Sequence, residues 1–296
     1  MKTTIYDIAK ATGFSASTVS RALNGTGYCN PRTKAKILEA AHVLHYSPSN
    51  AGRALKSQRS NRILFCIPDI MNPFYFKMIQ GATDVLNRHN FHCMLCYTQH
   101  SEAEELKYLD LLSEQYGDGM IMVSFNFSEA ITEKIRHAYF PIVTTNLMPS
   151  AQEDDCFDTV YVDHIRAIYL ATQALIDKGH RHIALAVGDT DEQTGRERLR
   201  GFGDCMKANG LPYSDKNIFI GDYTIASGKK IAQDILSAKD RFTGLVSAND
   251  LMALGIVSQL QAQGLSLPSD LSIVSLDNSE YADAVHPGLT SVDMKQ

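Results

Sequence analysis

Two sets of residues in this 296-residue chain have types and spacing that could bind another molecule. The first is a short run near the amino terminus in which small and hydroxyl-bearing side chains precede one arginine: Ser15, Ala16, Ser17, Thr18 and Arg21. The second is dispersed, and most of its members follow short apolar runs. Its members are Asn72, Phe74, Ser124, Asn146, Arg196, Arg198, Tyr223, Asn249 and Asp277. These groups offer hydrogen bonds rather than a nucleophile with its base, so we expect binding and no enzymatic activity.

The basic residues are concentrated at the amino terminus. Residues 1–62 contain ten lysines and arginines and two acidic residues, whereas the whole chain has 28 basic and 33 acidic residues and a net charge of −5. The rest of the chain is therefore strongly acidic. A basic segment attached to an acidic one is typical of proteins whose basic part contacts a polyanion such as nucleic acid.

The first 46 residues have the pattern of a small helical domain. Apolar residues at helical spacing predict a helix over 5–11, which ends near Gly13. Ser15 is suited to cap a second helix over 16–23, and Asn30, followed by proline, is suited to start a third. The apolar stripe of the third helix is expected to consist of Ile37, Leu38, Ala41 and Leu44. Two helices joined by a tight turn, with a third in support, form a helix-turn-helix.

The second helix of a helix-turn-helix enters the major groove of DNA. Small residues let its backbone approach closely, and hydroxyl groups hydrogen-bond to bases or phosphates. Arg21 could contact both acceptors of a guanine. The DNA-binding candidates in this domain are Tyr6, Ser15, Ala16, Ser17, Thr18, Arg21 and Asn24.

Two segments carry a resemblance to a known family: TIYDIAKATGFSASTVSRALNG (4–25) and PRTKAKILEAAHVLHYSPSNAGRALKS (31–57). They resemble the amino-terminal domain of the lac-repressor (LacI/GalR) family of bacterial transcriptional regulators, and the resemblance covers nearly the whole chain. It implies a homodimeric repressor that binds double-stranded, nearly palindromic operator DNA. It also implies a response to a small-molecule effector.

Residues 47–61 are predicted to form a linker, within which residues 50–55 can form less than two turns of helix, which is marginal alone. By resemblance it is the family's hinge helix, which pairs with that of the second subunit in the minor groove. Leu55 then matches the leucine that wedges between base pairs and kinks the DNA. Gly52 stands where valine or alanine is more usual, which predicts a looser hinge. The DNA-binding candidates here are Asn50, Arg53, Leu55 and Lys56.

From residue 62 onward, apolar runs alternate with amphipathic helical patterns such as 73–90 and 102–116, which predicts parallel sheets covered by helices. Strands are expected at 63–68, 91–98, 120–123, 142–145, 183–187, 218–222, 245–248 and 273–276. The predicted fold class is α/β, with an all-α helix-turn-helix domain at 1–46 and a two-lobed body at 62–296.

The resemblance implies that this body is the family's periplasmic-binding-protein-like core, with lobe 1 at about 62–162 and lobe 2 at about 163–291. The family's chain continues beyond LTSVDMKQ (289–296) into lobe 1 again. We therefore expect the last part of lobe 1 to be missing from this sequence.

Ligands of parallel α/β sheets bind at the carboxyl ends of the strands. The dispersed polar set offers paired hydrogen bonds beside aromatic faces, which suits a sugar or a sugar derivative. By resemblance, Arg198, Asn249 and Asp277 occupy the family's effector-binding positions. Asp250 is more simply explained as the N-cap of a helix over 251–263. A purine-like corepressor that tightens DNA binding is the alternative to an inducing sugar, and a solute-binding protein without DNA function is less favoured.

Other chemistry has little support in the sequence. Cys93 and Cys96 form a CxxC pattern, but residues three apart on a strand point to opposite faces, so we expect structural cysteines and no metal or other cofactor. The apolar runs are too short to span a membrane, and the first residues lack the apolar core of a secretory signal. The sequence therefore predicts a cytoplasmic protein that does not insert into membranes.

Overall fold

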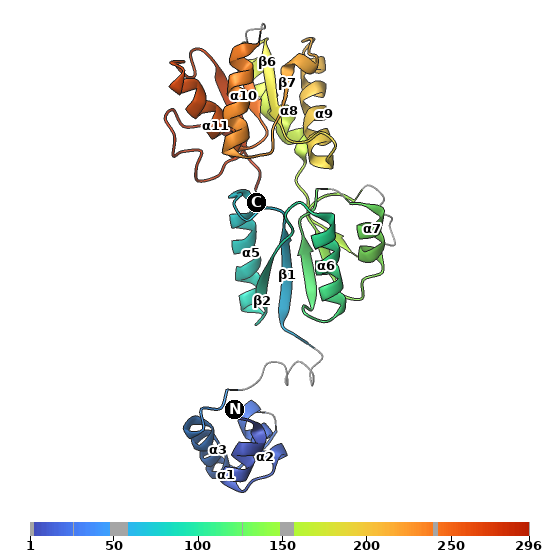
Figure 1. The fold of residues 1–296 in the computed structure, drawn as a ribbon, viewed down its shortest axis with the longest axis vertical. Coiled ribbons are helices and arrows are strands. Elements are labelled where there is room, and N and C mark those ends of the chain that lie inside the picture. Colours follow the sequence, from blue (N-terminus) through green and yellow to red (C-terminus); the bar gives the residue numbers. More distant parts are fainter. Residues whose placement is uncertain are drawn as a thin grey trace. The chain divides into compact units, whose positions relative to one another are not determined.

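The computed structural model describes residues 3–25, 27–47, 59–125, 127–148, 157–238 and 242–295. The chain divides into two compact units, Met1–Ser60 and Asn61–Gln296. The first is a small helical domain and the second consists of two α/β lobes (Figure 1). Within the described ranges, no helix is long and apolar enough to cross a membrane.

Three helices lie in the described part of the first unit, and each begins at a side-chain cap. The helices are α1 (Ile5–Thr12), α2 (Ala16–Asn24) and α3 (Pro31–Val43). The hydroxyl of Thr4 accepts from the backbone N–H of Asp7, that of Ser15 accepts from Thr18, and the amide oxygen of Asn30 accepts from Arg32. Gly13 ends α1 with a positive φ of 71°, which permits the tight turn into α2. The expected helix-turn-helix is therefore present.

The core of this unit is small and lies between the three helices. Its buried members are Ile8, Val19, Ala22, Ile37 and Ala41. The expected apolar stripe of α3 was wrong at one position, because Leu38 is 46% exposed. Leu38 follows Ile37 directly, and adjacent residues on a helix point about 100° apart.

Lobe 1 is a five-stranded parallel sheet with helices on both faces. Its strands are β1 (Arg62–Ile67), β2 (His92–Tyr97), β3 (Gly119–Met122), β4 (Ile142–Thr144) and β5 (Asp158–Thr159), in the order β2-β1-β3-β4-β5. Its helices are α5 (Phe74–Arg88), α6 (Glu102–Ser113) and α7 (Glu129–Arg136). Phe65 and Ile67 pack with α5 on one face, while Leu64 and Cys66 pack with α6 and α7 on the other. This alternation along β1 follows from the two-residue period of a strand.

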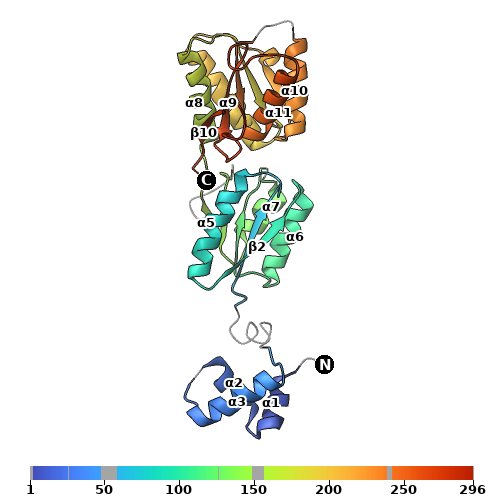
Figure 2. The ribbon, with the colours of Figure 1, turned by 90° about the vertical axis from the view of Figure 1, so that its left-hand side faces the viewer.

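Lobe 2 repeats this arrangement with a second five-stranded parallel sheet (Figure 2). Its strands are β6 (Ile183–Val187), β7 (Ile218–Ile220), β8 (Gly244–Ser247), β9 (Ser272–Asp277) and β10 (Thr290–Asp293), in the order β10-β9-β8-β6-β7. Its helices are α8 (His164–Asp177), α9 (Gln193–Ala208), α10 (Ile225–Ser237) and α11 (Asp250–Ala262), with a short 3-10 turn, η1 (Asp215–Asn217). One continuous apolar core joins α8, α9, α10 and α11 to the strands.

The eight expected strands are all present, and the structure adds β5 and β10. The CxxC segment lies on β2, where Cys96 packs into the core beneath α6 and Cys93 packs on the α5 face. The two thiols therefore point to opposite faces, as expected. Across the described part of the chain, no group of three or more His, Cys, Asp or Glu residues is placed to hold a metal ion.

Candidate functional site

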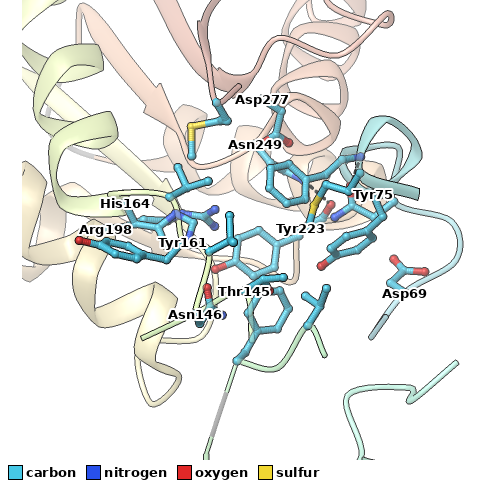
Figure 3. A pocket seen from close by; sticks show the side chains of 18 of the residues that line it. Asp69, Tyr75, Thr145, Asn146, Tyr161, His164, Arg198, Tyr223, Asn249 and Asp277 are labelled. Carbon is cyan, nitrogen blue, oxygen red and sulfur yellow. Dashed lines mark hydrogen bonds between the residues drawn. The ribbon is translucent and has the colours of Figure 1, made fainter. Parts of the chain in front are cut away.

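A cavity of about 420 Å³ is lined by residues of both lobes of the second unit. Several of the residues lining it lie at the end of a strand or within three residues after it, because parallel strands deliver their carboxyl ends to one edge of a sheet. Phe125 follows β3, Asn146 follows β4, Asn249 follows β8, and Asp277 ends β9. Figure 3 shows Asn146 of lobe 1 and Asn249 and Asp277 of lobe 2 converging on the cavity.

Seven of the nine ligand-binding candidates line this cavity. They are Asn72, Phe74, Asn146, Arg198, Tyr223, Asn249 and Asp277. The structure does not bring Ser124 and Arg196 to it. The Ser124 hydroxyl donates to the carboxylate of Glu105 at 3.2 Å in a separate, smaller recess. Arg196 is exposed on α9 and donates to the carbonyl of Asp191, because two positions along a helix turn its side chain away from that of Arg198.

Asn249 holds two elements of the cavity together. Its amide oxygen accepts from the N–H of Met252 at 3.0 Å and so caps α11. Its amide nitrogen donates to the carbonyl of Tyr223 at 2.9 Å, which fixes the loop that carries the Tyr223 ring. The expectation that Asp250 is the N-cap was wrong, since Asn249 occupies that position and Asp250 is the first residue of the helix.

The carboxylate of Asp250 is buried and ties the end of β9 to its surroundings. It accepts from the hydroxyls of Ser275 at 2.5 Å, Ser279 at 2.8 Å and Ser291 at 2.8 Å, and from the N–H of Ser279 at 2.7 Å. These bonds position the segment that follows Asp277. Asp250 therefore supports the cavity without lining it.

Arg198 and Tyr223 form one wall of the cavity. The guanidinium carbon lies 5.1 Å from the centroid of the Tyr223 ring, which is a cation–π contact. Arg198 Nε, the Tyr223 hydroxyl and His164 Nδ1 are buried and have no hydrogen-bond partner. Native proteins rarely leave buried polar atoms in this state.

The backbone at the cavity is also unusual. Tyr223 has a φ of 65°, Asp277 has 103° and Asn278 has 49°. Non-glycine residues rarely adopt these angles, and such strain clusters at functional sites. Gly188 permits the placement of the Tyr223 ring, because a Cβ at position 188 would overlap its phenol.

Burial dominates the electrostatics of the cavity. It raises the pKa of Asp277 well above its ordinary value, and the charge of Arg198 only partly opposes this. It lowers the pKa of His164 to about 3, with the charge of Arg198 acting in the same direction. His164 is therefore neutral at pH 7, and Asp277 holds its proton more strongly than an exposed aspartate does.

Individual side chains and backbone groups join the two lobes beside the cavity. The N–H of Gln193 donates to the carbonyl of Phe125 at 3.3 Å, and Lys77 Nζ donates to the carbonyl of Asn278 at 3.4 Å. The Phe125 and Tyr223 rings lie 6.4 Å apart. Phe74 of α5 packs against the apolar cores of both lobes, so hydrogen bonds and an aromatic side chain both join the lobes here.

Several residues that line the cavity were not among the sequence-based candidates: Asp69, Tyr75, His100, Phe125, Tyr161, His164 and Asp222. The strand-end rule could have found Phe125, which follows the same strand as Ser124. Tyr161 lies in the connection between the lobes, and His164 is the first residue of α8, so neither follows a strand that would point to it.

The DNA-binding candidates of the first unit lie on α1 and α2. Ser15 caps α2, and its hydroxyl lies 2.9 Å from the hydroxyls of Ser17 and Thr18. Arg21 and Asn24 are exposed, and Tyr6 is 76% exposed on α1. The hinge candidates Asn50, Arg53, Leu55 and Lys56 lie outside the described residues.

A helix-turn-helix unit followed by two α/β lobes around a cavity defines the class as a DNA-binding regulator with a small-molecule site. Comparison with known proteins identifies the family. Residues 4–49 match the description "Bacterial regulatory proteins, lacI family", and residues 60–292 match "Periplasmic binding proteins and sugar binding domain of LacI family". The chain belongs to the LacI family of bacterial transcriptional regulators.

Individual members of the family are similar over almost the whole chain. Catabolite control protein A of Priestia megaterium is 33% identical, with 99% of this chain and 87% of the relative covered. The HTH-type transcriptional repressor PurR of Aliivibrio fischeri (strain MJ11) is 30% identical over 98% of this chain and 86% of the relative. The solved complex of the transcriptional regulator CelR with cellobiose is 27% identical with a TM-score of 0.72, and covers 99% of this chain and 88% of that one.

Proposed function

We propose that this regulator is a repressor that binds operator DNA through its helix-turn-helix and releases it when a small sugar-like effector enters the cavity between the lobes. The observation that carries the proposal is the set of buried, unpartnered polar atoms on Arg198, Tyr223 and His164. A ligand that supplies their hydrogen bonds removes a cost that the unliganded protein bears.

The first unit supports the DNA-binding part. Ser17 and Arg21 are exposed on α2, and no large side chain precedes them on that helix. A second copy of the chain places a second α2 in the next half-site, so a two-fold symmetric dimer selects a nearly palindromic operator. The hinge assignments of Leu55, Asn50, Arg53 and Lys56 belong to this part of the proposal.

The cavity supports a sugar-like effector. Phe74 and Tyr223 offer aromatic faces, and Arg198, Asn249 and Asp277 offer polar groups beside them. This combination suits a hydroxylated ring. The similar CelR was solved in complex with cellobiose, which agrees with this class of ligand.

A purine-like corepressor is the second candidate, because the cavity is rich in aromatic side chains. Phe74, Phe125 and Tyr223 all line it, and a flat base binds well between aromatic faces. The similar PurR is named a transcriptional repressor, as this chain is proposed to be. The two candidate ligands have opposite effects on operator affinity, since an inducing sugar weakens operator binding and a corepressor strengthens it.

The effector acts by binding the two arrangements of the lobes with different affinity. Its contacts with both walls favour one lobe arrangement, and that arrangement sets the spacing of the two DNA-binding units in the dimer. The proposal includes no turnover of the ligand, and it places the protein in the cytoplasm, where the operator lies.

The test is fluorescence anisotropy of the full chain on DNA from upstream of its own gene, at fixed salt because phosphate contacts make affinity depend on salt. The titration is repeated with neutral sugars, sugar acids, sugar phosphates and purines. Release by a sugar-like compound supports the proposal. Tightening by a purine selects the second candidate, and equal affinity for operator and random DNA contradicts both.

A further inference from the structure

We propose that a small recess beside His164 is a subsite for one uncharged hydroxymethyl group of the effector, and that His164 is the residue that selects this group. The inference rests on the proposed function, because it specifies one part of the ligand that binds in the same cavity. It follows from the size of the recess, the charges in its walls and one buried nitrogen atom.

The recess adjoins the cavity between the lobes. It has a volume of about 60 Å³, and it shares four wall residues with the larger cavity: Asn146, Tyr161, Val162 and His164. Figure 3 shows Asn146, Tyr161 and His164 on the side of the cavity away from Asp69. A group that enters the recess can therefore belong to a ligand whose main part lies in the larger cavity.

The volume of the recess limits what it accommodates. A water molecule takes up about 30 Å³ in the liquid, so the recess has room for about two non-hydrogen atoms. A hydroxymethyl group consists of one carbon and one oxygen, whereas a phosphate group or a second sugar ring is larger. The ring of the ligand therefore lies in the larger cavity, which has a volume of about 420 Å³.

The walls of the recess are acidic. Asp163 and Glu197 line it, and no lysine or arginine does so among the described residues. Asp163 accepts from the backbone N–H of Arg166 at 2.8 Å, and Glu197 accepts from the side-chain amide of Gln193 at 2.9 Å, so both carboxylates are bonded to neutral donors. An anionic group placed here is repelled, whereas a hydroxyl group can donate to a carboxylate.

The charged groups of the larger cavity lie outside the recess. That cavity is lined by the carboxyl groups of Asp69, Asp222 and Asp277 and by the cations of Arg198 and Lys295. None of these five residues lines the recess. The preference of the recess for an uncharged group is therefore set by its own walls, whatever charge the rest of the ligand carries.

His164 brings an unpaired hydrogen-bonding atom to the junction of the recess and the cavity. The residue is 6% exposed, and its Nδ1 has no hydrogen-bond partner among the described residues. Burial lowers the pKa of His164 to about 3, with the charge of Arg198 acting in the same direction, so the ring is neutral at pH 7. A neutral imidazole has one donor and one acceptor nitrogen, and a hydroxyl group can pair with either. A hydroxymethyl group therefore satisfies Nδ1 in whichever tautomer the ring adopts.

The helix that carries His164 is firmly held in lobe 2. His164 is the first residue of α8, which is capped by the side chain of Asp163. Further along the same helix, Ala167, Ala171 and Leu175 are buried in the core of the lobe. A side chain on a packed helix is positioned more precisely than one on a loop, which suits a residue that selects one group of a ligand.

The first experiment compares sugars that differ at one exocyclic group, by calorimetry with the full chain. Glucose is compared with xylose, 6-deoxyglucose, glucuronate and glucose 6-phosphate, and galactose is compared with L-arabinose, D-fucose and galacturonate. We expect one hexose to bind about 10-fold or more tightly than each compound of its series. The reason is that each of those compounds leaves Nδ1 of His164 unpaired or brings a charge to the acidic recess.

Two variants assign this preference to His164. His164→Phe should lower the affinity for the hexose to that for its deoxy analogue, while the affinity for the deoxy analogue stays the same. The matched control is His137→Phe, at a histidine on lobe 1 whose side chain is 80% exposed, and it should leave the preference intact.

A second readout uses the wild-type chain and does not depend on choosing the right sugar. The ring nitrogen resonances of the histidines are followed by ¹⁵N NMR during titration with glycerol and with acetate, and the His164 signal is assigned by its loss in His164→Asn. We expect glycerol to shift the Nδ1 resonance of His164 and to leave that of the exposed His137 unchanged, with a smaller effect of acetate.

The inference is overturned if glycerol leaves the His164 resonance unshifted or if acetate shifts it more. In a series that binds, a pentose, deoxy sugar or sugar acid that binds as tightly as its hexose also overturns it. If none of the sugars binds, the glycerol titration decides alone. Operator release by a pentose or a sugar acid would still support the proposed function. Conversely, a chain that shows the glycerol shift but binds operator and random DNA equally would contradict only the proposed function, so the two failures are distinguishable.

Discussion

Glu105 makes the stability of lobe 1 depend on pH. It is buried on α6 and accepts from the Ser124 hydroxyl at 3.2 Å. Burial raises its pKa from the ordinary 4.5 to about 7, with Ser124 opposing the change and Glu102 adding to it. The folded state therefore holds the proton more tightly than the unfolded chain. The stabilisation from this proton is complete below pH 4.5 and is lost as the pH rises to about 7.

The size of this effect follows from the two pKa values. Their difference corresponds to about 3 kcal/mol of unfolding free energy. The variant E105Q removes the titration and keeps an acceptor for Ser124. We expect E105Q to be more stable than the wild type by on the order of 1–3 kcal/mol above pH 7, and equally stable near pH 4.5.

The assay is urea unfolding of wild type and variants between about pH 4.5 and pH 8. E104Q is the matched control, because Glu104 lies on the same helix, is less buried and pairs with Lys107 at 2.7 Å. It changes the net charge equally and should leave the pH profile unchanged. If E105Q retains the pH dependence of the wild type, the assignment of a raised pKa to Glu105 is refuted.

Three further variants test the DNA and effector sites. Arg21→Ala should weaken operator binding by about 1–3 kcal/mol and relax selectivity at one base pair, and equal weakening on random DNA would contradict a base contact. Leu55→Ala should reduce DNA bending in a gel-phasing assay, and unchanged bending would remove the wedge assignment. Gly188→Ala should displace the Tyr223 ring and weaken the effector about tenfold in calorimetry, while operator binding without effector stays the same. An unchanged effector affinity would show that the Tyr223 ring does not contact the ligand.

The sequence predicted the strands that are buried and apolar, because such runs carry a strong signal of their own. It missed β5 and β10, which have the sequences DT and TSVD. These short polar strands form because they hydrogen-bond to the backbone of a neighbouring strand. No local property of their residues indicates this pairing. The helices of the first unit were predictable because their caps are encoded beside the helices they begin.

Helix phase limited the prediction of the cavity. Arg196 and Arg198 are equally plausible ligand-binding residues when only the sequence is considered. Which of them is buried depends on the rotation of α9 about its axis. Asn249 and Asp250 are residue types that both favour the N-cap position. Which of them is the cap depends on whether α11 begins one residue earlier or later. Such choices are made by packing between elements, so the chain alone cannot reveal them.

The division of groups between the two walls explains how a ligand could act on the lobes. Lobe 2 supplies Arg198, Tyr223 and Asp277, while lobe 1 supplies Phe74 and Phe125, so a ligand reaches its full set of contacts only when the lobes are close. A hydrogen bond between the lobes, such as that from Gln193 to Phe125, is worth about 0.5–1.5 kcal/mol. One charge-assisted bond from a ligand to Arg198 is worth about 1.5–3 kcal/mol. The ligand contacts are therefore comparable with or larger than the contacts between the lobes, and binding can shift the lobe equilibrium substantially.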